Sequence, residues 1–178
     1  MEERRRRLRQ MALCAMLSAV TLALLLLACF LPSGRMGLSA VSGLCAAVAV
    51  CAVGYGGGLS CYVVSGVLGL LLLPSKEVAV YYCLCFGIYP VVKAWIESRK
   101  NLVLEWVLKL AVGNVLMLAV YWVLQKLLQI TLTFRGVGSW ALLAVGNAVF
   151  VCYDIAFSQI MTYVQRRLLP VLRRAKFV

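Results

Sequence analysis

Asp154 is the residue whose type and position point most directly to chemistry. It interrupts a long apolar segment, with Asn147 seven residues before it and Ser158 one helical turn after it on the same helix face. An ionisable side chain inside an apolar segment of membrane-spanning length is costly, and it is typical of proton relays and ion pathways. Asp154 is therefore our candidate for an intramembrane charge with a functional role.

A four-residue string, Ala-Val-Gly-Asn, occurs twice and ends at Asn114 and at Asn147. If the two segments are antiparallel helices, a rise of about 1.5 Å per residue places both Asn residues near the same depth. A glycine before each Asn would let the helices approach until the two amides meet. This contact could simply hold two helices together, or the amides could face a solute cavity together with Tyr121, which shares the Asn114 face.

Two short turns supply a second group of candidates. Arg35 lies in the turn Pro-Ser-Gly-Arg-Met-Gly, where exposed backbone N–H groups beside a guanidinium suit a carboxylate or a phosphate. Lys76 lies in a later turn just before Tyr81. The alternatives are a solvated loop charge and an aromatic side chain of the membrane-interface belt. The substrate-binding candidates are thus Arg35, Lys76, Tyr81, Asn114, Tyr121 and Asn147.

Two lysines lie one helical turn from a glutamate. Lys109 follows Glu105 in the favourable i,i+4 order, and Lys93 precedes Glu97 in the reverse order. We interpret Lys109 as an interfacial ion pair whose side chain reaches the membrane surface. The sequence allows either lysine to neutralise Asp154.

These residues belong to an almost continuously apolar chain. Hydrophobic residues make up 64% of the 178 residues, and the mean hydropathy is +0.97, which excludes an ordinary soluble domain. Pro and Gly turns divide the chain into six apolar segments. We therefore predict an all-α membrane protein, a single domain over residues 1–178 that forms a bundle of six transmembrane helices. The predicted spans are 10–31, 38–54, 58–73, 78–97, 102–129 and 138–165.

The basic residues predict the orientation of this bundle. With six spans both termini share one side, and that side carries fourteen of the 18 Lys and Arg residues, including the run from Arg4 to Arg9. Such a bias marks the cytoplasmic side and predicts an N-in, C-in topology. Because the charges lie at the ends of apolar spans, the net charge of +12 indicates a lipid bilayer and not nucleic acid as the partner.

No catalytic or cofactor motif is found. The chain has no His, no Walker A string, no Gly-x-Ser-x-Gly string and no paired acidic motif, so we do not expect an enzyme. The eight cysteines lie in or beside apolar spans without a Cys-x-x-Cys spacing, and we interpret them as small hydrophobic side chains. No metal or other cofactor is expected.

The first span carries a face of small residues formed by Ala12, Ala15, Ala19 and Ala23. Its start, basic residues followed by MALCAMLSA over 11–19, resembles the first helix of energy-coupling factor (ECF) transporter S components. These are the substrate-binding membrane subunits of prokaryotic vitamin and micronutrient importers, and an Ala-x-x-x-Ala pattern on their first helix marks the family. The strings LPSGR and LPSKE are also similar to a group of S components whose substrate is unassigned.

The resemblance implies a function and partners. An S component binds its solute in a pocket open to the outside and docks through the Ala face on a transmembrane coupling subunit, which two cytoplasmic ATPases drive. We therefore predict a solute-binding subunit in the plasma membrane of a prokaryote, with its solute in the outer half of the bundle. The alternatives are a stand-alone secondary transporter that uses Asp154 and a structural or assembly subunit of a membrane complex.

Overall fold

The computed structural model describes residues 2–31, 33–98, 102–126 and 139–174, and these are helical apart from short turns. Six helical spans are long and apolar enough to cross a membrane, which confirms the predicted all-α membrane protein. The helices are α1 (Glu2–Phe30), α2 (Arg35–Val53), α3 (Tyr55–Leu72), α4 (Lys76–Tyr81), the π-helix η1 (Tyr82–Phe86), α5 (Tyr89–Glu97), α6 (Leu102–Lys126) and α7 (Ser139–Arg174).

Several helix bounds differ from the predicted spans, and α1 begins at Glu2, eight residues before the predicted start at 10. The fourth predicted span consists of α4, η1 and α5, and α7 continues to Arg174, well beyond the predicted end at 165. The predicted turn over 130–138 and the end of the fifth predicted span, 127–129, lie outside the described residues.

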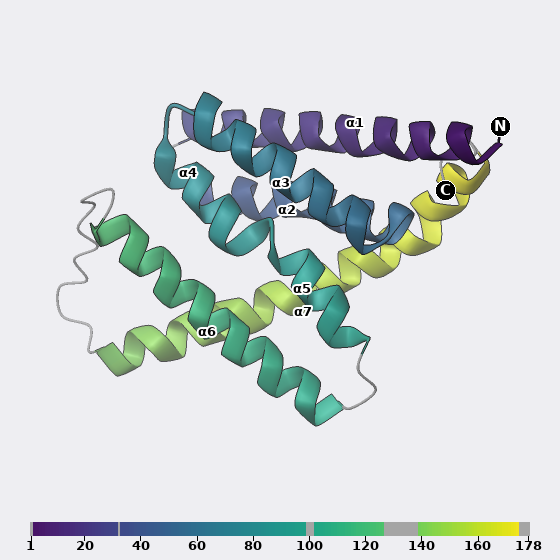
Figure 1. The fold of residues 1–178 in the computed structure, drawn as a ribbon. Helices are drawn as coiled ribbons and strands as arrows, with labels where there is room; N and C mark the ends of the chain where they lie inside the picture. Colours follow the sequence, from purple (N-terminus) through teal and green to yellow (C-terminus); the bar gives the residue numbers. More distant parts are fainter. Residues whose placement is uncertain (1, 32, 99–101, 127–138, 175–178) are drawn as a thin grey trace.

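Helices α1, α2 and α3 pack side by side along one side of the molecule (Figure 1). They approach closely because small residues form the contact, among them Ala46, Ala49 and Ala52 of α2, all buried. Ser18 and Thr21 are also buried, and each hydroxyl donates to a carbonyl of its own helix, at 2.9 and 2.8 Å. The buried polar groups on this face of α1 are therefore satisfied without water.

The turn between α2 and α3 is a single residue, Gly54, with φ of +97°. Side chains other than glycine rarely adopt this left-handed conformation, which explains the glycine at this position. The tight turn holds α2 and α3 antiparallel and in contact.

The π-helix η1 lies in the middle of the fourth span, and it ends where Gly87 N donates to Tyr82 O at 2.7 Å. Pro90 follows at the start of α5 and has no N–H to donate to the carbonyl of Phe86, four residues earlier. The Phe86 carbonyl instead lies directly against Gly43 of α2. The irregular helix and the glycine thus fit together.

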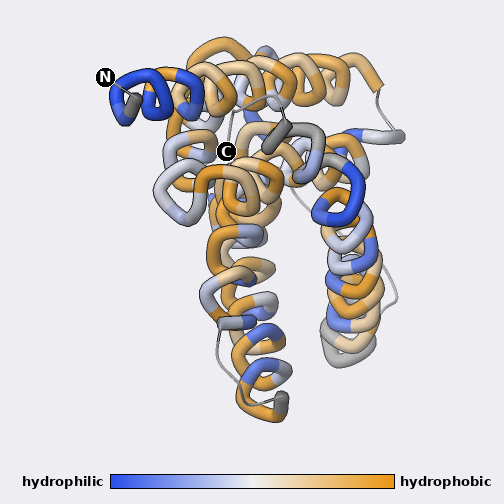
Figure 2. The backbone as a smooth tube through the Cα atoms, turned by 90° about the vertical axis from the view of Figure 1, so that its right-hand side faces the viewer, coloured by the Kyte–Doolittle hydropathy of each residue, from blue (hydrophilic) through white to orange (hydrophobic). Residues whose placement is uncertain are grey.

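Helices α6 and α7 cross at a distance from α1, and the C-terminal half of α7 rises toward the start of α1 (Figure 1). Both α5 and α7 pack against α2. Large apolar side chains such as Val107, Val115, Trp122 and Val149 are exposed on α6 and α7. Figure 2 shows apolar residues along most of the helices and a strongly hydrophilic start of α1. This distribution fits a chain whose outer surface is covered by lipid.

Candidate functional site

Three charged side chains are buried together where α5, α6 and α7 meet. Lys93 of α5, Lys109 of α6 and Asp154 of α7 are only 4, 3 and 3% exposed. Charged residues are almost never buried to this extent unless they are paired. One charge from each of three helices therefore meets in a single site.

Asp154 accepts contacts from three donors. The Tyr89 hydroxyl donates to Asp154 Oδ1 at 2.6 Å, and the Lys93 ammonium contacts the same oxygen. Lys109 Nζ lies 3.3 Å from the other oxygen, Oδ2. Both lysines neutralise Asp154, whereas the sequence left open which of the two would do so.

Each lysine also contacts other acceptors, and Glu97 is common to both. Lys93 Nζ lies 3.0 Å from Glu97 Oε1 and 2.8 Å from Ser158 Oγ. Lys109 Nζ lies 2.9 Å from the same Glu97 oxygen and 2.7 Å from Glu105 Oε1. We call the five charged residues the ion network: Lys93, Glu97, Glu105, Lys109 and Asp154.

The ion network changes our interpretation of Lys109. The predicted i,i+4 contact with Glu105 is present, but the lysine side chain is buried between helices and does not extend to the membrane surface. Because desolvating an ammonium group is costly, three carboxylate partners are needed to keep it there.

Aromatic rings surround the ion network. Tyr89 packs edge-on against Phe150 and Phe157, at centroid distances of 5.4 and 6.2 Å. The Lys93 ammonium lies 5.9 Å from the Phe157 centroid, and Lys109 Nζ lies 5.6 Å from that of Trp106. Ring faces attract cations and exclude water, so they strengthen the electrostatic interactions inside the site.

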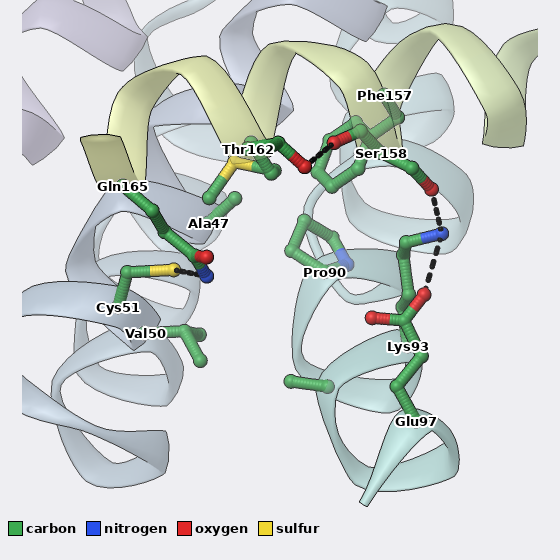
Figure 3. A pocket seen from close by; sticks show the side chains of 12 residues that line it. Ala47, Val50, Cys51, Pro90, Lys93, Glu97, Phe157, Ser158, Thr162 and Gln165 are labelled. Carbon is green, nitrogen blue, oxygen red and sulfur yellow. Dashed lines mark hydrogen bonds and ion pairs between the residues drawn. The ribbon is translucent and has the colours of Figure 1, made fainter. Parts of the chain in front are cut away.

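A pocket of about 340 Å³ adjoins the network (Figure 3). Two residues of the ion network, Lys93 and Glu97, line the pocket. Ser158, which accepts from Lys93, lines it as well. The lining also includes the ends of α2 and α5, which lie on the same side of the molecule as the two chain termini (Figure 1). The pocket residues are Ala47, Val50, Cys51, Pro90, Lys93, Ala94, Glu97, Phe157, Ser158, Met161, Thr162 and Gln165.

The predicted contact between Asn114 and Asn147 is confirmed. Each amide nitrogen donates to the oxygen of the other residue, at 3.0 and 3.1 Å. A Cβ at Gly113 would lie 2.8 Å from the Phe150 ring, and one at Gly146 would lie 3.0 Å from the sulfur of Met117. The two glycines therefore make room for side chains of the facing helix, whereas the repeated string predicted a close approach of the two backbones.

The other predicted ligand residues lie apart from the pocket. Arg35 NH1 forms an ion pair with Glu77 Oε2 at 3.2 Å, which joins the starts of α2 and α4. Lys76 donates to the carbonyl of Leu70 at 2.7 Å, Tyr81 is half-buried and Tyr121 is 44% exposed. None of the six predicted substrate-binding residues lines the pocket described above.

The small-residue face of α1 is directed outward. Ala12, Ala15, Ala19 and Ala23 are all exposed, whereas Leu13, Ser18 and Leu25 on the other face are buried against the bundle. The face is therefore accessible to lipid or to another membrane protein.

Sequence reasoning named Lys93 as one of two possible partners of Asp154, but it did not identify Tyr89 and Glu97 as members of the same site. The signal that could have identified this site is the similar depth of its charged residues in the membrane, measured from the helix ends. Counted from the predicted span ends at 97, 102 and 165, Lys93, Lys109 and Asp154 lie four, seven and eleven residues deep, which is within about three helical turns. Among the described residues, no group of three Cys, Asp or Glu side chains is placed to hold a metal ion.

No protein-family model, curated protein or solved structure matches this chain. The functional argument therefore depends on the site itself.

Proposed function

We propose that this chain is the solute-binding membrane subunit of an ATP-driven importer, of the energy-coupling factor type, in the plasma membrane of a prokaryote. The observation that carries the proposal is the pocket whose wall includes the buried lysine of the ion network. Ionisable groups inside a membrane domain are costly, and they are typical of solute and ion pathways. The expected solute is a vitamin or another small micronutrient.

We further propose that both termini are cytoplasmic. The basic N-terminal turns of α1 and the bias of Lys and Arg toward the side of the termini support this orientation. The pocket would then lie in the cytoplasmic half of the bundle, and the ion pair of Arg35 with Glu77 would lie on the outside. This location differs from the outer half of the bundle, where the sequence predicted the solute. A pocket in the inner half suits the end of the cycle at which solute is released.

The partners in this proposal are a transmembrane coupling subunit and two cytoplasmic ATPases. The outward direction of Ala12, Ala15, Ala19 and Ala23 supports docking, since small residues let two membrane helices approach closely. A bulky side chain in this face should separate the helices while leaving the pocket unchanged.

The test is purification of the tagged chain from its own membranes, with mass spectrometry of the proteins that accompany it. We expect ATPase subunits with the wild type, their loss with Ala19→Leu and their retention with Ala148→Leu. The control makes the same change at an exposed position of α7. If Ala19→Leu keeps the ATPases, or if the wild type carries none, the importer proposal is wrong.

A second candidate is a stand-alone secondary transporter, which the contact of Asp154 with two lysines favours. Proton or ion binding at Asp154 would rearrange the contacts that join α5, α6 and α7. This candidate requires that the purified chain alone, in liposomes, accumulates a solute in response to an ion gradient. Uptake that needs ATP and the ATPase subunits would eliminate it.

A further inference from the structure

The pocket offers hydrogen-bond acceptors, and its one ammonium group is already occupied. Lys93 has three N–H donors, and they have three partners: Asp154, Ser158 and Glu97. An anionic solute would have to displace one of these partners from a buried lysine. The contacts therefore do not favour a carboxylate or a phosphate at this wall.

Glu97 offers a second acceptor oxygen beside the one that the lysines contact. Both lysines lie close to Oε1, at 3.0 and 2.9 Å. The Glu97 side chain is 41% exposed, and Figure 3 shows its second oxygen directed into the space between α2 and α5. A carboxylate oxygen in this position can accept a hydrogen bond from a bound solute.

The charges of the ion network favour the same kind of solute. The network contains three carboxylates and two ammonium groups, so it carries one excess negative charge when all five are ionised. A bound cation beside Glu97 would balance this charge.

The opposite wall adds an acceptor and an apolar surface. The Gln165 amide nitrogen lies 3.5 Å from the sulfur of Cys51, which leaves the amide oxygen to accept from a solute. Phe157 and Met161 supply apolar contacts between the two walls. A volume of about 340 Å³ lies near the lower end of the range for small-molecule sites, which fits a small solute.

We infer that this pocket binds a small organic cation through a primary ammonium group, seated between Glu97 and Gln165 and beside the Phe157 ring. The inference depends on the proposed solute-binding function and specifies its site and the chemical class of its ligand. Glu97 is the ligand residue for the ammonium group, and Lys93 holds the Glu97 carboxylate in place.

The test uses Cys51, a free thiol that lines the pocket, as a reporter. The purified full-length chain is treated with a small thiol reagent, and labelling of each cysteine is followed by mass spectrometry. The probes are benzylamine, neutral benzyl alcohol and anionic benzoate, which share one ring and differ in charge. Cys152, an exposed free thiol of α7 outside the pocket lining, is the internal control.

We expect benzylamine to slow labelling of Cys51 in a saturable manner without affecting Cys152, and benzoate and benzyl alcohol to have little effect. Glu97→Gln should raise the benzylamine concentration for half-protection about tenfold or more, because a charge-assisted hydrogen bond is lost. Glu105→Gln removes the same charge from the network away from the pocket lining and should change that concentration less than about threefold. Size-exclusion profiles and thermal unfolding establish that both variants are folded.

Equal or better protection by benzoate or benzyl alcohol would overturn the ammonium assignment while leaving a solute-binding pocket in place. Absence of protection by all three probes would overturn it as well. The importer proposal has a separate test, co-purification of ATPase subunits, so the two can fail independently.

Discussion

Lys93 of α5 and Asp154 of α7 form an ion pair whose side chains are only 5% and 4% exposed. Lys109 of α6 contacts the same carboxylate, so a single aspartate connects three helices. Since much of the apolar surface of α6 and α7 is exposed, these polar contacts contribute a large part of what fixes the two helices against α5.

Asp154→Asn should lower the free energy of unfolding by about 3–5 kcal/mol, because it leaves two buried ammonium groups with too few carboxylate partners. Thermal or denaturant unfolding in detergent measures the loss. Glu77→Gln is the control: its ion pair with Arg35 is about one-third exposed, and the expected loss is below about 1 kcal/mol.

A double variant distinguishes an unpaired charge from a general packing defect. Asp154→Asn combined with Lys109→Met removes one charge of each sign, so the combined loss should be clearly smaller than the sum of the two single losses. If the loss in the double variant equals the sum of the two single losses, Asp154 does not act through its contact with Lys109.

The amide pair of α6 and α7 should behave as one unit. Asn114→Leu and Asn147→Leu should each cost about 1 kcal/mol, in the range found for side-chain hydrogen bonds between membrane helices. The double variant should cost little more than the more damaging single variant, since one substitution already breaks both hydrogen bonds. Unfolding titrations of the four proteins in detergent measure the coupling, and independent effects would contradict it.

The sequence predicted the six spans and the Asn pair because both depend on local patterns. Apolar runs of about 20 residues follow from the membrane thickness, and the repeated string placed a glycine beside each Asn. The same local reasoning did not reveal the ion network, because Lys93 with Glu97 and Glu105 with Lys109 also fit ordinary surface pairs. Only the meeting of α5, α6 and α7 in the fold shows that Lys93 and Lys109 are buried.

The break in the fourth span could not be predicted for a different reason. Pro90 signals that one helical hydrogen bond is missing, but it does not determine whether the helix kinks or widens into a π-helix. In the fold, the Phe86 carbonyl packs against Gly43 of α2, a residue far away in sequence.

The proposed topology predicts the location of the C-terminus. A green fluorescent protein fused after Val178 should fluoresce in bacterial cells, and alkaline phosphatase at the same position should be inactive, because the enzyme requires export. The reverse pattern would contradict the N-in, C-in orientation and would move the pocket to the outer half of the membrane.

Gly43→Ala tests whether the close approach of α2 to the irregular fourth span matters for stability. A Cβ at residue 43 would lie 2.4 Å from the Phe86 carbonyl oxygen, a backbone atom that cannot move without shifting the whole turn. We expect the free energy of unfolding to fall by about 1–3 kcal/mol, as for other overpacked sites.

Gly37→Ala on the same helix is the matched control, because a Cβ there meets nothing within 4 Å. Its stability should be unchanged or higher by up to about 1 kcal/mol, since alanine favours the helix. Equal melting temperatures for the two variants would mean that the Phe86 carbonyl does not press against α2.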